Sequence, residues 1–196
     1  HIKNDIFIKY VMNALGKLEA LPTGKVLLQR LEHSPYPLTI RYGDPHFWAE
    51  DDTGKAMAGM QMAQAVQFLK TLRWPDYGYQ FNHMGAGGEI NFDPKLAAEF
   101  IEDDGRKRKA LPEVVLAHEM MHAFDGIRGL LDRREVVGDA YEFIEVTEYR
   151  ATFMENRIRE ESGAHYRKYY SNDGSSPGSL LGEDGKPMLL PAPCLE

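Results

Sequence analysis

Hydrophobic residues recur along the first hundred positions with two different periods. Over residues 5–20 and 23–32 they return every three or four positions, which predicts two helices near the N-terminus. Residues 38–42 and 89–93 instead alternate apolar and polar side chains, and each stretch predicts a short β-strand. The first half of the chain therefore supplies two helices and at least two strands of a sheet.

The segments around these strands have weaker patterns. Residues 43–56 and 74–88 contain the Gly and Pro residues typical of loops, whereas residues 57–72 have helical spacing and a Met-rich face. Residues 95–103 predict a short helix. The basic run at 106–109 predicts a solvated loop rather than a docking patch.

Two longer helices follow in the second half of the chain. The first covers residues 112–126, with a proline at its start and a glycine at its end, and the second runs from about residue 134 to 161. After these helices, the Gly, Ser, Pro and Asp content predicts an irregular tail over residues 171–196. We therefore expect an α+β domain over residues 1–170, in which a small mixed or antiparallel sheet packs on the two long helices.

The composition of the chain excludes several classes of protein. Its 196 residues include 30 acidic and 23 basic side chains, a net charge of −7 that argues against a general nucleic-acid binder. No apolar run is long enough to predict a transmembrane helix. The one cysteine, Cys194, excludes an internal disulfide framework and a zinc site built from thiolates.

The first long helix contains the motif H-E-x-x-H, formed by His118, Glu119 and His122. Helix positions four apart lie on one face, so the two imidazoles can bind one Zn²⁺ ion, while Glu119 lies beside the ion and can take a proton from a metal-bound water. The alternative is a pair of surface histidines beside a glutamate. Because three unpaired polar groups are costly in an apolar helix through a core, the motif favours a zinc enzyme.

A catalytic zinc site usually needs a third protein ligand, and two carboxylates are candidates. Asp125 lies on roughly the same helix face as the histidines, although an acid at a helix end also bonds the terminal turn. Glu148 lies within the apolar stripe of the second long helix, where a carboxylate needs a cation. That cation is either the metal or an arginine such as Arg150 or Arg157.

Three segments within residues 110–170, LAHEMMHAFDGIRG, VTEYRATFMENRIREESG and HYRKYY, resemble the NleD/XopG/HopH group of bacterial type III secretion effector zinc metalloproteases. They also resemble the clostridial neurotoxin light chains. In those toxins a ligand Glu is followed two residues later by Arg, as Glu148 and Arg150 are here, and Arg150 is then a partner that orients Glu148. An Arg-x-x-Tyr pair in the toxins faces the scissile carbonyl, and Arg167 and Tyr170 match it.

The resemblance implies a zincin-like metalloprotease domain of the gluzincin kind. In it, His118, His122 and Glu148 hold Zn²⁺, Glu119 is the general base, and Arg167 or Tyr170 stabilises the oxyanion. The protein would be secreted by a bacterium and delivered into the host cell cytoplasm. There we expect a monomer without nucleic-acid or membrane partners, which cleaves a host protein such as a signalling kinase.

Two further hypotheses accompany this interpretation. The strand at residues 89–93 is either the sheet edge that receives an extended substrate or a plain structural edge. The alternative to an enzyme is a catalytically silent zinc-binding or partner-binding module with a protease-like fold. Glu119 separates the two functions, because a structural zinc site needs no Glu beside its first histidine and closes all four positions with protein ligands.

Overall fold

A small sheet, two long central helices and several hairpins make up the computed structural model, which describes residues 4–49, 85–96, 98–132, 135–137, 143–171, 174 and 179–188. The helices are α1 (Asn4–Glu19), α2 (Pro22–Glu32), α5 (Pro112–Gly126) and α6 (Val146–Ser162). The strands are β1 (Leu38–Tyr42), β2 (His46–Ala49), β3 (Gly88–Phe92), β4 (Glu99–Ile101), β5 (Lys107–Lys109), β6 (Glu135–Val137) and β7 (Phe143–Glu145). The helix predicted over 57–72 lies outside the described residues.

The main sheet has the strand order β1-β3-β2 and is mixed. Strand β3 pairs in parallel with β1, with Leu38 opposite Gly88, and antiparallel with β2, with Ala49 opposite Gly88. The prediction that residues 89–93 form a sheet edge is therefore wrong, because β3 is the central strand. Alternation of side chains identifies the two faces of a strand but not the strands that pair with it. The second neighbour, β2, lies within residues 43–56, for which the sequence predicts a loop.

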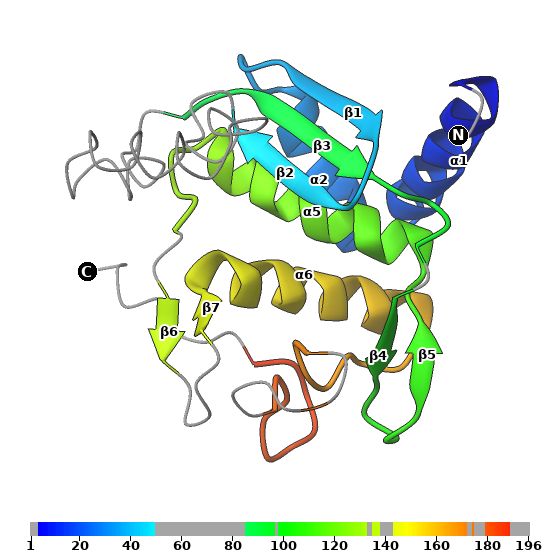
Figure 1. The fold of residues 1–196 in the computed structure, drawn as a ribbon, viewed down its shortest axis with the longest axis vertical. Coiled ribbons are helices and arrows are strands. Elements are labelled where there is room, and N and C mark those ends of the chain that lie inside the picture. The colour runs from blue at the N-terminus through cyan, green and yellow to red at the C-terminus, as the bar shows by residue number, and fades with distance from the viewer. Residues whose placement is uncertain are drawn as a thin grey trace, which may run out of the picture.

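Helix α5 lies directly beneath the sheet, with α1 and α2 beside it (Figure 1). It is buried on nearly all sides, as its almost continuous apolar sequence around the histidines predicts. Close contact with the sheet depends on two glycines: a Cβ on Gly126 would lie 2.6 Å from the Phe47 ring, and one on Gly88 would lie 2.5 Å from it. The contact between Gly126 and Phe47 therefore lets the histidine-bearing helix lie close to the sheet.

Helix α6 runs along the other side of α5 (Figure 1). It begins at Val146, so the prediction of a helix from residue 134 is wrong in its first part, where β6 and β7 form an antiparallel hairpin with Glu135 opposite Glu145. Its end after Ser162 is confirmed: Gly163 adopts φ 72°, and the backbone N–H of Ala164 donates to the carbonyl of Arg159 at 2.9 Å.

A second hairpin lies at the C-terminal end of α6 (Figure 1). Strands β4 and β5 pair antiparallel there, which contradicts both the short helix predicted over 95–103 and the solvated loop predicted over 106–109. Gly105 turns the chain between them with φ 79°. The Lys168 N–H donates to the carbonyl of Ile101 at 2.9 Å, and the Leu180 N–H donates to the carbonyl of Lys168 at 2.8 Å. The described part of the predicted tail is therefore packed on this layer.

The predicted α+β class is confirmed by this architecture of helices and small sheets. The two helices that carry the candidate site residues lie side by side at its centre, so residues far apart in the sequence can meet between them. Among the helices that the structure describes, none has both the length and the apolar composition to cross a bilayer.

Candidate metal centre

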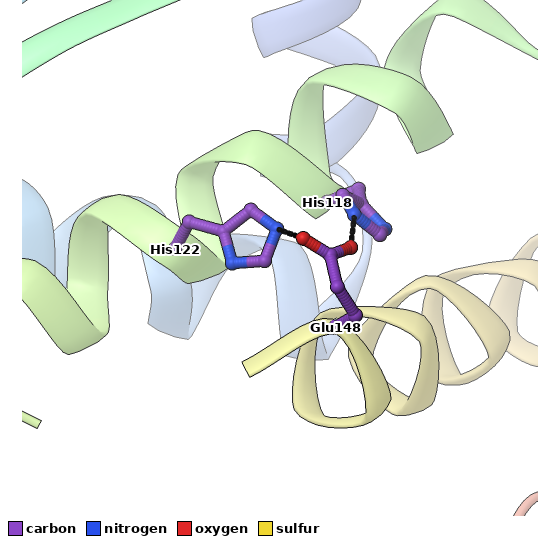
Figure 2. A group of neighbouring side chains, drawn as sticks. All are labelled: His118, His122 and Glu148. Carbon is purple, nitrogen blue, oxygen red and sulfur yellow. Dashed lines mark hydrogen bonds and ion pairs between the residues drawn. The ribbon is translucent and has the colours of Figure 1, made fainter. Parts of the chain in front are cut away.

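The two histidines of the H-E-x-x-H motif face α6 from adjacent turns of α5. Their ring centroids are 4.8 Å apart and their planes are nearly perpendicular, at 81°. Glu148 reaches them from the first turn of α6 (Figure 2). The Nε2 atom of His118 is 3.1 Å from Glu148 Oε2, and the Nε2 atom of His122 is 3.3 Å from Glu148 Oε1. One carboxylate thus bridges both imidazoles.

This donor set fits a divalent metal ion such as zinc. Two imidazole nitrogens and one carboxylate oxygen are the protein ligands of many catalytic zinc sites. Ligand atoms roughly 2.0–2.1 Å from a tetrahedral ion lie about 3.3 Å from one another, which agrees with the two separations of 3.1 and 3.3 Å. The three ligand atoms all lie within 4.8 Å of each other, so His118, His122 and Glu148 can share one ion.

A polar side chain of α6 lies next to the second nitrogen of each imidazole. The Nδ1 atom of His122 is 3.0 Å from the hydroxyl of Thr147, a buried residue next to Glu148. The Nδ1 atom of His118 is buried and makes no hydrogen bond to the residues that the structure describes, but it lies at ion-pair distance, 3.4 Å, from Glu155 Oε2. Such partners fix the orientation of a ligand histidine and leave Nε2 free to face a metal.

Charge in the site follows from these contacts. Burial opposes a proton on His118, but the carboxylates of Glu148 and Glu155 outweigh it and raise the pKa of this imidazole to about 10. Burial opposes ionisation of Glu148 as well, yet the two histidines hold its pKa well below the usual range. The cluster therefore contains an anionic carboxylate that stabilises a cation between the helices.

Glu119 lies beside His118 and is only 6% exposed. Burial is the largest influence on its carboxyl and raises its pKa above the usual value. Glu119 and His118 line the same cavity of about 350 Å³. A carboxyl group that is buried, raised in pKa and open to a cavity next to a metal-ligand group can accept and return a proton.

The cavity has one apolar wall and one polar wall. The apolar wall comes from the ends of β2 and α5 and from the β4 region; its residues are Pro45, Leu96, Phe100 and Val115. The polar wall comes from α5, α6 and the segment after α6; its residues are His118, Glu119, Glu155, Arg167, Tyr170 and Ser171. The cavity can therefore bind an apolar group next to the candidate ligands.

Tyr170 and Arg167, which we predicted as a pair of oxyanion donors, are placed differently. The Tyr170 hydroxyl donates to Glu148 Oε2 at 2.9 Å, and both burial and Glu148 raise its pKa, so it stays protonated. The guanidinium of Arg167 donates to Glu155 and to the carbonyls of Tyr169 and Tyr170, and it stacks 3.7 Å from the Phe100 ring. The structure brings the hydroxyl of Tyr170 to the ligand group and holds Arg167 behind it.

Asp125 is not part of the ligand group. It is fully buried, and its two carboxylate oxygens accept hydrogen bonds from Nε and Nη2 of Arg150 at 2.7 and 2.8 Å. The suggestion that Arg150 orients Glu148 is therefore wrong, because Arg150 pairs with Asp125. This pair joins the end of α5 to the start of α6, one turn beyond the candidate ligands.

Glu155 and Thr147 are site residues that the sequence reasoning missed. Glu155 follows Glu148 by seven positions, which are two helical turns, so the shared face of the two acids was a signal available in the sequence. Thr147 had no comparable signal. Its position at the start of α6 depends on where that helix begins, which sequence spacing placed twelve residues too early.

A second group of potential ligands, Asp103, Asp104 and His165, lies at the β4–β5 turn and is exposed. Arg108 holds the carboxylate of Asp104 through both of its terminal nitrogens, at 3.0 and 2.6 Å. His165 Nδ1 is 2.8 Å from Asp103. Ion pairs within the hairpin, and one between the hairpin and His165 in the segment after α6, therefore account for this group.

Comparison with known proteins adds one finding. The family model Peptidase M91, described as an effector protein, matches residues 3–170. This span includes the whole candidate metal centre and ends at Tyr170. A search of curated proteins gave no match.

Proposed function

The chain belongs to the Peptidase M91 family of effector proteins, and on this premise we propose that it is a zinc-dependent endopeptidase of bacterial origin that acts on a host protein. The observation that carries the proposal is the convergence of three candidate ligand atoms, together with the cavity that one of these residues, His118, lines with the buried Glu119. His118, His122 and Glu148 would hold the zinc ion. When bound there, zinc supplies Lewis acidity toward the peptide carbonyl and toward water.

The remaining steps belong to side chains of the protein. Glu119 takes a proton from the attacking water at a carboxylate oxygen and later passes it to the nitrogen of the leaving amine. Its raised pKa suits the first role, because a carboxylate with a higher pKa is a stronger base and takes a proton from water more readily than an ordinary carboxylate. Burial of Glu119 keeps bulk water away from this proton.

Tyr170 is the residue that we propose as the donor to the developing oxyanion. Its hydroxyl lies at the ligand group, 2.9 Å from Glu148, and stays protonated because its pKa is raised. A donor that is already in position when charge develops stabilises the transition state without reorganisation. Arg167 supports this role from behind through its bond to the Tyr170 carbonyl.

The apolar wall of the cavity supports a substrate with an apolar side chain next to the cleaved bond. Phe100, Leu96 and Val115 contribute this wall, and a cavity of about 350 Å³ has room for one large side chain. The resemblance to the NleD group makes a host signalling kinase the first substrate class to examine. Secretion and delivery into the host cytoplasm follow from the same proposal.

The test compares the wild-type protein with Glu119→Gln in a host-cell lysate, with new protein termini mapped by mass spectrometry. We expect the wild type to generate termini that Glu119→Gln produces about 10²–10⁴-fold more slowly, because the variant lacks the general base. The variant should still bind zinc. Glu113→Gln is the matched control: Glu113 lies on the same helix but pairs with Lys17 at 3.1 Å, away from the site, so cleavage should persist.

Two outcomes would contradict the proposal. Cleavage by Glu119→Gln at the wild-type rate would remove Glu119 from the reaction. A zinc-loaded wild type that generates no new terminus would favour the alternative of a catalytically silent zinc-binding module.

A further inference from the structure

Glu155 is a buried carboxylate behind the metal-ligand group, and the peptidase chemistry above does not use it. It is 2% exposed and lies two turns after Glu148 on the same face of α6. Its Oε2 atom accepts a hydrogen bond from Nη1 of Arg167 at 2.9 Å and lies 3.4 Å from Nδ1 of His118. One oxygen therefore faces both a candidate ligand and an arginine of the next segment.

Arg167 transmits this contact to the main chain beyond α6. Its Nε donates to the carbonyl of Tyr169 at 3.0 Å, and its Nη2 donates to the carbonyl of Tyr170. The backbone N–H of Arg167 in turn donates to the side-chain oxygen of Asn156 at 2.7 Å. The guanidinium is thus held by three acceptors, Glu155 and the carbonyls of Tyr169 and Tyr170, and it holds the main chain from which the Tyr170 side chain extends.

These contacts close into a ring. Glu148 contacts His118 and accepts a hydrogen bond from the hydroxyl of Tyr170. Through its carbonyl, Tyr170 binds Arg167, which binds Glu155. Glu155 completes the ring at His118, where its Oε2 atom lies at ion-pair distance from Nδ1. The ring includes two candidate metal ligands and the proposed oxyanion donor, and Glu155 is the member that contacts a ligand on one side and the Tyr170 segment on the other.

The charge of Glu155 is balanced within the protein. Glu102, Arg159, Glu155 and Arg167 form a row of alternating charges, each 5% exposed or less. Arg159 donates to Glu102 at 2.8 Å and to Glu155 at 3.1 Å. Burial opposes ionisation of Glu155, but Arg167, His118 and Arg159 hold its pKa below the usual range. Glu102 lies at the far end of this row, where its other ion pair is with Arg108.

We propose that Glu155 is a positioning residue for the peptidase reaction, which orients His118 toward the metal and, through Arg167, holds Tyr170 beside Glu148. The inference rests on the proposed function. The proposal also distinguishes the two histidines by the group next to Nδ1. This group is a carboxylate, that of Glu155, for His118 and a neutral hydroxyl, that of Thr147, for His122. A carboxylate partner makes the ligand imidazole more basic and fixes its ring. Arg167 then acts by placing Tyr170 rather than by contacting substrate.

The row of charges offers a matched control for a purely structural role. Glu155→Gln and Glu102→Gln each remove one buried carboxylate charge from the same four-residue row. If Glu155 served only to balance the charges of Arg159 and Arg167, both variants would lower the melting temperature, and both would bind zinc with the same affinity. If Glu155 positions the ligand, only Glu155→Gln will weaken zinc binding.

The experiment measures zinc affinity by competition with a chelator, using the full chain and zinc alone as the probe, together with kcat and KM. For Glu155→Gln we expect zinc affinity to fall about 10–100-fold and kcat to fall with KM little changed. Glu102→Gln should bind zinc within about twofold of the wild type. Arg167→Lys keeps a positive charge near Glu155 but loses the bonds to the main-chain carbonyls, so kcat should fall while zinc affinity stays.

Equal zinc affinity in Glu155→Gln and Glu102→Gln would overturn the inference. If Glu155→Gln does not fold, the double variant Glu155→Gln/Arg167→Gln restores the charge balance of the row. Its zinc affinity is then compared with that of Arg167→Gln alone. Equal affinities of these two variants would also overturn the inference. A wild type that binds zinc but cleaves nothing would refute the proposed function, while the affinity comparison would still decide the role of Glu155.

Discussion

At the scale of the residue, the two carboxylates near the histidine pair have different partners. Glu148 bridges both imidazoles, whereas Asp125 binds Arg150 through both oxygens. We predict that Glu148→Ala loses most zinc binding with a modest change in stability. Asp125→Ala should keep zinc but lower the free energy of unfolding by about 3 kcal/mol, because it leaves Arg150 without its buried partner. Metal analysis after dialysis and urea denaturation of both variants provide the measurement.

The reverse pattern would identify Asp125 as the third ligand. In that case Asp125→Ala would emerge from dialysis without metal, and Glu148→Ala would retain one ion per chain. The geometry of the Asp125–Arg150 pair would then have to change on metal binding.

Proton release on metal binding is a second prediction at this scale. Because the pKa of His118 is raised to about 10, its imidazole carries a proton at pH 7 when no metal is bound. Binding to Nε2 displaces that proton, so about one proton should be released per zinc from His118 at pH 7. The apparent affinity should rise with pH and level off near pH 10. Calorimetry in two buffers with different ionisation enthalpies measures the release, and identical heats in both buffers would contradict it.

Sequence identified the residues of the motif but not all of their roles. That His118 and His122 lie close together could be predicted, because positions four apart in one helix share a face. The direction of Arg167 could not, because its partners Glu155 and the Tyr170 carbonyl come from α6 and from a turn of the main chain. Local spacing contains no information on such packing.

At the scale of the element, the position of α5 under the sheet depends on how closely β2 approaches it. Gly126→Ala would place a Cβ 2.6 Å from the Phe47 ring, closer than carbon atoms pack, so the ring or the helix has to move. We predict a loss of about 1–3 kcal/mol in the free energy of unfolding, the usual cost of an overpacked core. Thermal denaturation measures this.

Gly16→Ala is the control for that substitution. Gly16 lies within α1, and a Cβ there would meet no atom within 4 Å, so the change should be neutral or stabilising. Equal melting temperatures for Gly126→Ala and the wild type would show that the sheet is free to move relative to α5.

Elements differed in how well the sequence predicted them. Helix α5 was predicted with its correct ends because its apolar run is long and is bounded by Pro112 and Gly126. Strands β2, β4 and β5 are three or four residues long and depend on pairing with another strand for their stability, so their local sequence patterns were too weak to identify them. The β6–β7 hairpin was read as helix for the same reason.

At the scale of the whole molecule, residues 179–188 belong structurally with the preceding domain. Leu180 is buried and its N–H donates to Lys168, although the family match ends at residue 170. We predict that Leu180→Ala lowers the free energy of unfolding by about 2 kcal/mol, because removing most of this buried side chain creates a cavity. Met188→Ala is the exposed control and should change it by less than about 1 kcal/mol. Urea denaturation of both variants is the measurement, and equal values would place this segment outside the folded domain.

The way the helices pack against each other could not be predicted from the sequence. The α+β class followed from the mixture of periods, but the identity of the third ligand depends on how α6 crosses α5. That crossing brings Glu148 and Glu155 to His118, and Arg150 to Asp125. Each of these pairs joins α5 to α6, so the pairings depend on the three-dimensional packing of the two helices.

The central claim is that His118, His122 and Glu148 hold one metal ion at the cavity beside Glu119. A crystal structure of the protein grown with zinc, with anomalous scattering recorded at the zinc absorption edge, tests it most directly. We predict one strong anomalous peak about 2 Å from His118 Nε2, His122 Nε2 and a Glu148 oxygen. A peak confined to Asp103, Asp104 and His165, or no peak near the histidine pair, would contradict it.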